Sequence, residues 1–244
     1  MAKSDEIAYY ERQTADGRRH ADGKPFTDED CGGLLIGLGQ VMTLLPRPPA
    51  HVLDVGCGTG WTSEFLARAG YRVTGLDISP AMIEASRRLR SLPGLDFVAA
   101  DFEHMTFDRS FDAVLFFGSL HHSENPEAAL AACRNALTEG GVIVLMEPGE
   151  GHEKAEHSKT CAREFGLTER SLPPVMSCGM LQKLGFRDLQ ALPMLSVLSA
   201  LLRQPTEQRS AKYRLAARML GTHVATALQA ARSSRNVAIV TARR

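Results

Sequence analysis

The chain has 244 residues, and its 28 Lys and Arg balance 28 Asp and Glu to a formal net charge of zero. This length suffices for one α/β domain with additions, and the neutral balance does not indicate a nucleic-acid-binding protein. The five cysteines form no C-x-x-C pair, which favours reduced thiols in the cytoplasm over a disulfide framework. We find no apolar signal core at the N-terminus and no membrane span, which needs roughly 20 apolar residues.

Residues 1–50 precede the first predicted strand, and we expect a helical lid and lead-in there. The segment 8–30 is polar and carries the adjacent Tyr9 and Tyr10. A helix is predicted over 30–45, although its four glycines weaken it. The prolines in residues 46–49 then end this helix and lead into the core.

A glycine turn follows the first predicted strand, residues 51–55. Gly56, Gly58 and Gly60 stand at alternate positions, and a predicted helix begins at Trp61. Glycine lets the backbone turn sharply and lets a ligand approach where a Cβ would clash. The helix would offer free N–H groups at its first turn, so strand, glycine turn and helix together are typical of a nucleotide-binding site.

The spacing of these glycines indicates which nucleotide is bound. The dinucleotide fingerprint is G-x-G-x-x-G, whereas this turn is G-x-G-x-G with Trp61 in the place of the third fingerprint glycine. Asp54, just before the turn, would put a carboxylate beside a cationic group of the ligand. S-adenosyl-L-methionine (SAM) has an ammonium and a sulfonium group and no phosphate, so the pattern favours SAM.

The rest of the chain alternates strands with helices. Strands are predicted over 71–76, 95–100, 111–117, 141–146, 186–192 and 236–241. Helices are predicted over 80–90 and 126–137. This alternation predicts an α/β fold with a doubly wound, mostly parallel sheet of seven strands, whose ligands bind beyond the carboxyl ends of the strands. The residues at those ends are Asp54, Asp77, Asp101, Gly118 and Glu147.

Five segments of residues 51–148, in order, resemble the class I SAM-dependent methyltransferases of the type 11 group. They are VLDVGCGTGW, VTGLDISPAMIEAS, FVAADFEHMTF, FDAVLFFGSLHHSENPEAAL and LTEGGVIVLMEP. The resemblance implies a Rossmann-like fold, SAM as the methyl donor and S-adenosyl-L-homocysteine as the product. It identifies 51–148 as the SAM-binding core and says little about 151–236.

The same resemblance implies that the glycine turn holds the methionine part of SAM. Gly56, Cys57, Gly58 and Gly60 would line that part, and Asp54 would lie near its ammonium group. Cys57 is expected to be a small packing residue rather than a nucleophile, because nothing adjacent lowers its pKa.

The later strand ends would hold the rest of the cofactor. Asp77 would accept hydrogen bonds from the ribose hydroxyls, and Ile78 would pack on the adenine. Asp101 would receive the adenine amino group, with Phe102 on the ring. The backbone of Gly118–Ser119 would face the amino-acid end.

Methyl transfer to a hydroxyl gains from a general base, and histidine is the natural candidate. His121 and His122 follow the fourth predicted strand, where the transferred methyl should lie, and are the candidate catalytic residues. A purely structural role for this pair stays open. The candidate substrate-binding residues are Tyr9, Tyr10, Glu147, His152 and His157.

A divalent metal is not expected from the sequence. Residues His152 and His157 are five apart, one too many for a pair on the same face of a helix. No other group of His, Cys and Glu shows the spacing of a ligand set.

Two segments without known motifs complete the chain. Residues 149–185 are interpreted as an insertion after strand five. Residues 186–244 hold the last two strands and, between them, a helical cap insertion over 193–235. Leu220, Val224 and Leu228 recur there at helical spacing. A cap over the substrate pocket, a homodimer surface, or packing on the sheet would each explain this face.

We therefore predict a SAM-dependent methyltransferase that acts on a small-molecule or carbohydrate-like acceptor, with oxygen favoured. The alternatives are N- or C-methylation of a metabolite or quinone-like lipid, a nicotinamide-dependent oxidoreductase, and a non-catalytic SAM-binding protein. Nucleic acid is not an expected partner, because the fourth strand lacks the Asn/Asp-Pro-Pro-aromatic signature of nucleic-acid amino methyltransferases.

Overall fold

The computed structural model describes residues 3–107, 111–196 and 238–244. Its helices are α1 (Lys3–Arg12), α2 (Ala15–Gly23), α3 (Cys31–Leu44), α4 (Trp61–Arg68), α5 (Pro80–Leu89), α6 (Pro126–Ala136), α7 (Glu156–Phe165) and α8 (Pro174–Lys183), with the 3-10 turns η1 (Leu120–His122) and η2 (His152–Lys154). Its strands are β1 (His51–Val55), β2 (Arg72–Asp77), β3 (Leu95–Ala99), β4 (Phe111–Phe117), β5 (Leu137–Met146), β6 (Arg187–Pro193) and β7 (Ala238–Arg243).

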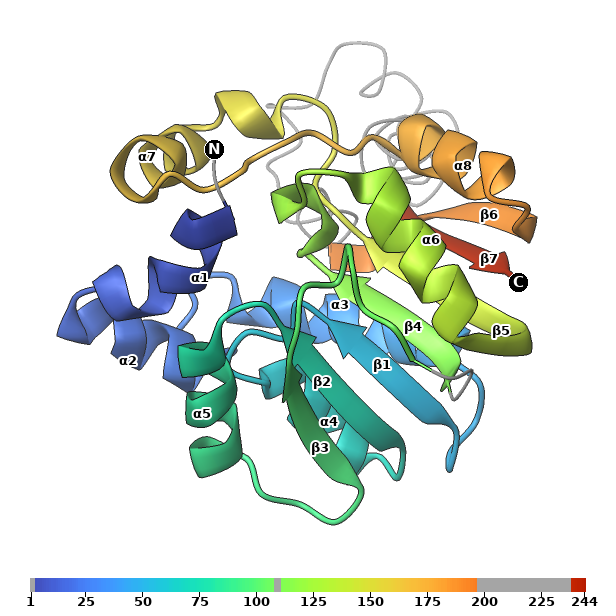
Figure 1. Ribbon diagram of the computed structural model, residues 1–244, viewed down its shortest axis with the longest axis horizontal. Helices are drawn as coiled ribbons and strands as arrows, with labels where there is room; N and C mark the ends of the chain where they lie inside the picture. The colour runs from blue at the N-terminus through green and yellow to red at the C-terminus, as the bar shows by residue number, and fades with distance from the viewer. Residues whose placement is uncertain (1–2, 108–110, 197–237) are drawn as a thin grey trace, which may run out of the picture.

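The seven strands form one sheet in the order β3-β2-β1-β4-β5-β7-β6 (Figure 1). Strands β1 to β5 pair in parallel, while β7 runs antiparallel to both β5 and β6. This confirms the predicted mostly parallel, doubly wound sheet. β5 begins at Leu137, earlier than predicted, because Leu137 pairs with Phe111 ahead of a register shift.

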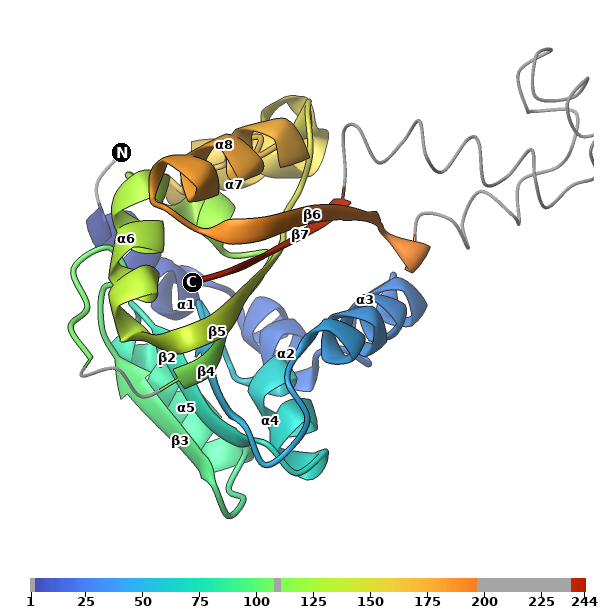
Figure 2. The same ribbon diagram turned by 90° about the vertical axis from the view of Figure 1, so that its right-hand side faces the viewer.

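The sheet is buried on both faces, as parallel sheets are. Val52 belongs to the core layer that includes residues of α3, α4 and α5. Leu53 and Val55 belong to the layer that includes residues of α6 and α8. Figure 2 shows α3 and α4 on one side of the sheet and α6 and α8 on the other.

Two helices lie within the predicted insertion 149–185, and they have different roles. Pro174 occupies the first turn of α8, where its missing N–H and fixed φ suit a helix start. Met180 and Leu181 of α8 then join the core of the sheet. Helix α7 instead lies beside α1, away from the sheet (Figure 1).

Most of the predicted cap insertion, residues 197–235, lies outside the described residues, as does its helical pattern. The cap and dimer-surface interpretations therefore stay predictions. Within the described part of the chain, no helix is both long and apolar enough to cross a membrane.

The site lies where the order of the strands reverses, between the neighbouring strands β1 and β4. The connection after β1 leads to α4 on one face, and the connection after β4 leads to α6 on the other. Diverging connections of this kind leave a crevice at the carboxyl ends of the strands. The glycine turn begins at that crevice, directly after β1.

Gly60 is required for the packing of this turn rather than for ligand access. It is the N-cap of α4 with φ +80°, in the left-handed region. A Cβ at this position would lie 2.6 Å from the ring of Phe97 on β3. Helix α4 can therefore lie close to the sheet only if residue 60 lacks a side chain.

We expect Gly60→Ala to lower the free energy of unfolding by about 2–5 kcal/mol. Roughly 1–2 kcal/mol arises from the left-handed backbone and about 1–3 kcal/mol from overpacking against Phe97. Urea unfolding followed by circular dichroism measures the change. Gly179→Ala in α8 is the matched control, because a Cβ there meets no atom within 4 Å and should stabilise the helix slightly. Equal urea midpoints for wild type and Gly60→Ala would contradict the proposed packing.

Candidate functional site

A cavity of about 400 Å³ lies at the carboxyl ends of the strands and is covered by residues of α1 and α7. The turn after β1, the end of β2 and the loops after β3 and β4 form its floor. Lys3, Glu6 and Tyr9 of α1 line it from one side, and His157 and Cys161 of α7 from another. The cavity thus lies where the sequence predicts the cofactor.

The glycine turn and the loop after β4 meet at the floor of this cavity. Gly56 has φ +70°, and a Cβ there would lie 2.4 Å from the Cβ of Ser119. Gly118, in the loop after β4, has φ +67°, and a Cβ there would meet no atom within 4 Å. The bare backbone at Gly118 therefore borders open space in which a ligand fits. Five predicted cofactor residues of these two loops line the cavity: Gly56, Cys57, Gly58, Gly118 and Ser119.

Asp77, the last residue of β2, presents a buried carboxylate to the cavity. One oxygen accepts the N–H of Gly58 and the other accepts the N–H of Ser79, each at 2.9 Å. Burial raises the pKa of Asp77 in spite of these bonds. A carboxylate has about four acceptor positions, so Asp77 can still receive hydroxyl donors of a ligand. Ile78, the next residue, also lines the cavity.

Asp101, after β3, is tied to the N-terminal helix. Its Oδ2 lies 2.5 Å from Nζ of Lys3 and 2.7 Å from Nδ1 of His104. Burial alone would raise the pKa of Asp101, but the bonds from Lys3 and His104 outweigh it, and the pKa lies below its ordinary value. Asp101 and Phe102 both line the cavity, where the sequence predicts the adenine.

Two predicted cofactor residues, Asp54 and Gly60, do not line the cavity. The Asp54 side chain is buried, and its Oδ2 accepts the hydroxyls of Thr62 at 2.5 Å and Ser63 at 2.6 Å. Asp54 therefore stabilises the first turn of α4, and its predicted contact with the cofactor ammonium group stays a prediction.

Two predicted substrate residues, Tyr10 and Glu147, are also absent from the cavity wall. The hydroxyl of Tyr10 donates to Oδ1 of Asp22 at 2.8 Å, which fastens α1 to α2. Tyr9 does line the cavity, and its ring packs edge-on against Phe165 of α7. Neighbouring helix positions face different directions, so only one of the two tyrosines can point inward.

Glu147 positions the loop that carries the histidines. Its Oε1 accepts the N–H groups of Ser119 at 3.0 Å and Leu120 at 2.9 Å. Its Oε2 lies 3.2 Å from the N–H of His121 and 2.8 Å from Nδ1 of the same residue. A single buried carboxylate thus fixes three consecutive backbone groups and one imidazole.

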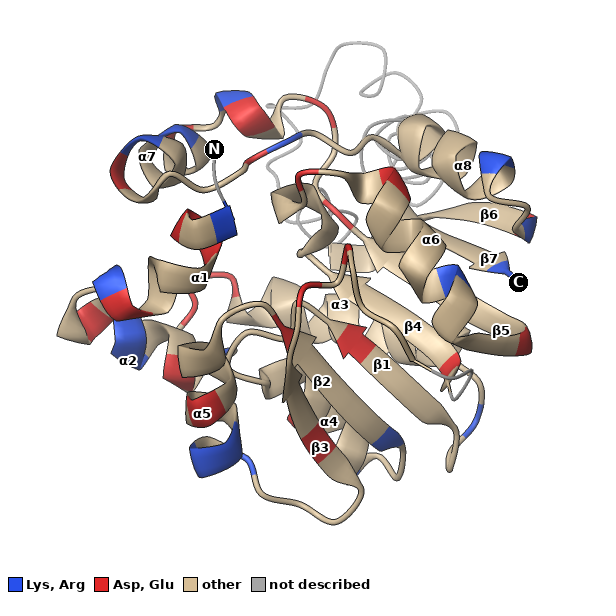
Figure 3. Ribbon diagram, viewed as in Figure 1, with Lys and Arg blue, Asp and Glu red and all other residues tan. Residues whose placement is uncertain are grey.

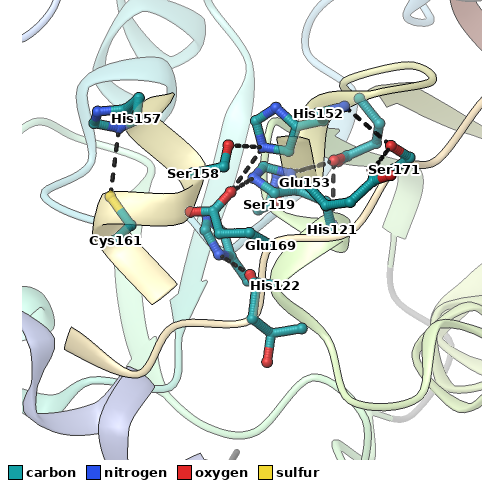
Figure 4. A network of polar contacts seen from close by, with 12 residues as sticks. Ser119, His121, His122, His152, Glu153, His157, Ser158, Cys161, Glu169 and Ser171 are labelled. Carbon is teal, nitrogen blue, oxygen red and sulfur yellow. Dashed lines mark hydrogen bonds and ion pairs between the residues drawn. The ribbon is translucent and has the colours of Figure 1, made fainter. Parts of the chain in front are cut away.

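The histidines gather on one wall of the cavity with a glutamate that sequence reasoning missed (Figure 4). Oε2 of Glu169 lies 2.7 Å from Nε2 of His152 and 3.9 Å from Nε2 of His121. The rings of His121 and His122 have centroids 4.0 Å apart. His157 is set aside from this group and contacts Sγ of Cys161 at 3.5 Å.

His122 is held in its neutral form. Its Nδ1 lies 2.8 Å from the carbonyl oxygen of Thr168. Burial, followed by the neighbouring His121, lowers the pKa of His122 to about 3. The carbonyl can only accept, so Nδ1 carries the proton and Nε2 keeps a lone pair.

Acidic side chains outnumber basic ones around the cavity. Figure 3 shows acidic positions along the segments that follow the strands at this edge. Glu6 of α1 accepts the N–H of Thr168 at 2.8 Å, and burial raises its pKa to about 7. The sequence offered no signal for Glu6 or Glu169, because neither stands at a strand end or in a recognised motif.

The spacing of residues along the sequence indicated no group of metal ligands, but the fold brings three candidate ligands together among the described residues. His121, His122 and Glu169 each offer a ligand atom, and these atoms lie within 4.8 Å of one another. The sequence search compared spacings along one helix. The fold instead brings residue 169 back to the 3-10 turn η1, so spacing could not reveal the group.

Comparison with known proteins places the core in a family. The profile of the methyltransferase domain matches residues 53–145. Residues 53–145 form a class I SAM-dependent methyltransferase domain. SAM is the cofactor of such domains, which agrees with the glycine turn and with the buried Asp77 at the cavity.

A curated relative gives a more specific similarity over part of the chain. The ubiquinone biosynthesis O-methyltransferase of Xanthomonas campestris pv. campestris is 36% identical over 114 residues. That match covers 45% of this chain and 48% of the relative, so the chain matches only about half the length of the curated protein.

Solved structures share the fold over nearly the whole chain. Phosphoethanolamine N-methyltransferase 2 of Haemonchus contortus, in complex with SAM, matches with a TM-score of 0.67 and 18% identity over 98% of this chain and 59% of its own. A SAM-dependent methyltransferase of Mesorhizobium loti matches with a TM-score of 0.59 and 19% identity over 86% of this chain and 98% of its own. At this identity the likeness concerns the fold alone.

We expect Glu147→Gln to lower the free energy of unfolding by roughly 1–3 kcal/mol for each donor left without an acceptor. Glutamine offers one acceptor oxygen and one NH₂ donor, so it cannot serve all four donors of this loop. Urea unfolding measures the effect. Glu139→Gln, exposed near the other end of β5, is the control and should change stability by less than about 0.5 kcal/mol. Equal effects of the two substitutions would refute the positioning role of Glu147.

Proposed function

We propose that this protein transfers the methyl group of SAM to a hydroxyl of a small-molecule or carbohydrate-like acceptor. The observation that carries the proposal is that one cavity has the predicted cofactor-binding residues at one end and the histidines on a wall. The curated relative named as an O-methyltransferase supports oxygen as the accepting atom.

The cofactor roles that we propose follow the walls of the cavity. Gly56, Cys57 and Gly58 hold the methionine part of SAM, together with the backbone of Gly118–Ser119. Asp77 accepts the ribose hydroxyls. The adenine lies between Ile78 and Phe102, with its amino group on Asp101.

When bound, SAM supplies the electrophilic methyl group and a neutral leaving group, so the protein need only orient and desolvate the reactants. Orientation of this kind lowers a bimolecular barrier by roughly 7–11 kcal/mol. Tyr9 and Glu6 cover the cavity from α1 and exclude water from it. His121 and His122 activate the acceptor hydroxyl, which must lose its proton as the new C–O bond forms and the C–S bond breaks.

The proposal extends to the location of the protein and to its partners. All five cysteines are free thiols, which supports a reducing, cytoplasmic location. The acceptor is a small molecule rather than a nucleic acid, because the cavity is covered by α1 and α7. A homodimer through residues 193–235 stays a prediction.

An amine acceptor is the second candidate, and the charge of the wall favours it. Glu6, Glu103, Glu124 and Glu169 line the cavity, where the basic partners are Lys3 and Lys24. An excess of carboxylates attracts a protonated amine. Labelled-methyl transfer to matched hydroxyl and amine compounds separates the two candidates.

We expect Asp77→Asn to weaken SAM binding roughly 10- to 100-fold. Each charged hydrogen bond from a ribose hydroxyl contributes about 1.5–3 kcal/mol, and the amide would also disturb the N–H groups of Gly58 and Ser79. Isothermal calorimetry with SAM measures the dissociation constant. Asp96→Asn, exposed on β3, should bind SAM as wild type does. Unaltered affinity in Asp77→Asn would remove the ribose assignment.

We expect His121→Ala and His122→Ala each to lower kcat roughly 100-fold or more, while the dissociation constant for SAM stays within about twofold of wild type. The reason is that both rings lie on the acceptor wall and neither belongs to the cofactor end. Transfer of labelled methyl from SAM, first to an extract and then to the purified acceptor, gives kcat. Lys159→Ala, exposed on α7, serves as the control. Full activity in both histidine variants would show that the two rings have a structural role and no catalytic one.

A further inference from the structure

Two imidazoles and one carboxylate converge on the acceptor wall of the cavity. One ligand atom of each of His121, His122 and Glu169 lies within 4.8 Å of the others. We propose that these three residues bind a divalent transition-metal ion whose open coordination positions face the cavity. The use of that ion in methyl transfer rests on the proposed function, whereas its binding does not.

Hydrogen bonds fix both rings in the form that a metal requires. Nδ1 of His121 is held by the Glu147 carboxylate at 2.8 Å, and Nδ1 of His122 by the Thr168 carbonyl at 2.8 Å. Both partners are acceptors, so Nδ1 donates in each ring and Nε2 is the nitrogen that remains available to a metal. Histidines that ligate metals almost always donate their other ring N–H to a carboxylate or a backbone carbonyl in this way.

The carboxylate of Glu169 is also held by a hydrogen bond. Its side chain is 7% exposed, and its Oε2 lies 2.7 Å from Nε2 of His152. Figure 4 shows Glu169 among the rings of His121, His122 and His152. Carboxylates that ligate metals are themselves hydrogen-bonded, so His152 acts as a positioning residue for Glu169.

The donor set indicates the kind of metal. Two imidazoles with one carboxylate suit Zn²⁺, or Fe²⁺ and its neighbours, whereas Mg²⁺ and Ca²⁺ prefer oxygen ligands throughout. Three protein ligands leave at least one position for a water or a substrate oxygen. The group therefore has the composition of a catalytic site rather than a closed structural one.

The ion gives the histidines a specific way to activate the acceptor. A hydroxyl that binds the metal loses its proton more easily, because the cation stabilises the alkoxide. In that step the acceptor hydroxyl would lose its proton to solvent, its oxygen would form the C–O bond to the methyl carbon, and the C–S bond of SAM would break. No oxidant or reductant is needed.

The test uses the full chain without an affinity tag, stripped of metal with a chelator. Zn²⁺ and Co²⁺ are titrated separately by calorimetry, and Co²⁺ binding is also followed by its visible absorption. We expect one ion per chain with micromolar affinity or better. His122→Ala and Glu169→Gln should weaken binding at least 10- to 100-fold, the loss that even outer-shell changes cause. Glu156→Gln on α7, at an exposed side chain that pairs with Lys159, is the control.

The outcomes separate the two proposals. SAM binding by each variant, measured by calorimetry, shows that it is folded. The absence of Zn²⁺ and Co²⁺ binding, or equal affinity in wild type and Glu169→Gln, overturns the metal site. Methyl transfer that is unchanged after complete metal removal overturns the role of the ion. Stoichiometric metal binding without methyl transfer to any extract component would instead count against the proposed function and leave the metal site standing.

Discussion

The site depends on one buried interaction, the carboxylate of Glu147 at the end of β5. It accepts the N–H groups of Ser119, Leu120 and His121, three consecutive residues of the loop after β4. Ser119 in turn donates its hydroxyl to the carbonyl of Val55 at 2.5 Å, and thereby joins this loop to the end of β1. The floor of the cavity and the wall that carries the histidines are therefore held by the same short chain of contacts across three adjacent strands.

The cover of the cavity is fastened differently from its floor. Lys3 of α1 pairs with Asp101, and Glu6 accepts the N–H of Thr168, so α1 is linked to both walls. Arg12 donates to the carbonyl oxygens of Glu164 and Phe165 at the end of α7. These links are partly exposed and individually weak, whereas the floor is bonded through buried groups. The links that hold the cover are therefore more exposed to solvent than those that hold the floor.

The sequence predicted the position of those cavity residues that stand at strand ends or in a short motif. The glycine turn, Asp77 and Asp101 all stand at strand ends, and the structure brings them to one cavity. Asp54 also stands at a strand end, but its carboxylate accepts the hydroxyls of Thr62 and Ser63 of α4, so its predicted contact with the cofactor stays a prediction. Sequence reasoning missed Glu169, because residue 169 reaches the histidines only through the tertiary path of the insertion, which no local pattern encodes.

The charge of the cavity would favour a cationic methyl donor over its neutral-sulfur product. Among the residues that the structure describes, the acidic side chains of Glu6, Asp77, Asp101, Glu103, Glu124 and Glu169 line the cavity, against Lys3 and Lys24. SAM carries a sulfonium charge that the product lacks, so each transfer removes one attraction between the ligand and this wall. A metal ion on Glu169 and the histidines would offset part of the negative charge on the acceptor side only. The donor end would then keep its preference for a cation, while the acceptor end would be free to hold an anionic oxygen.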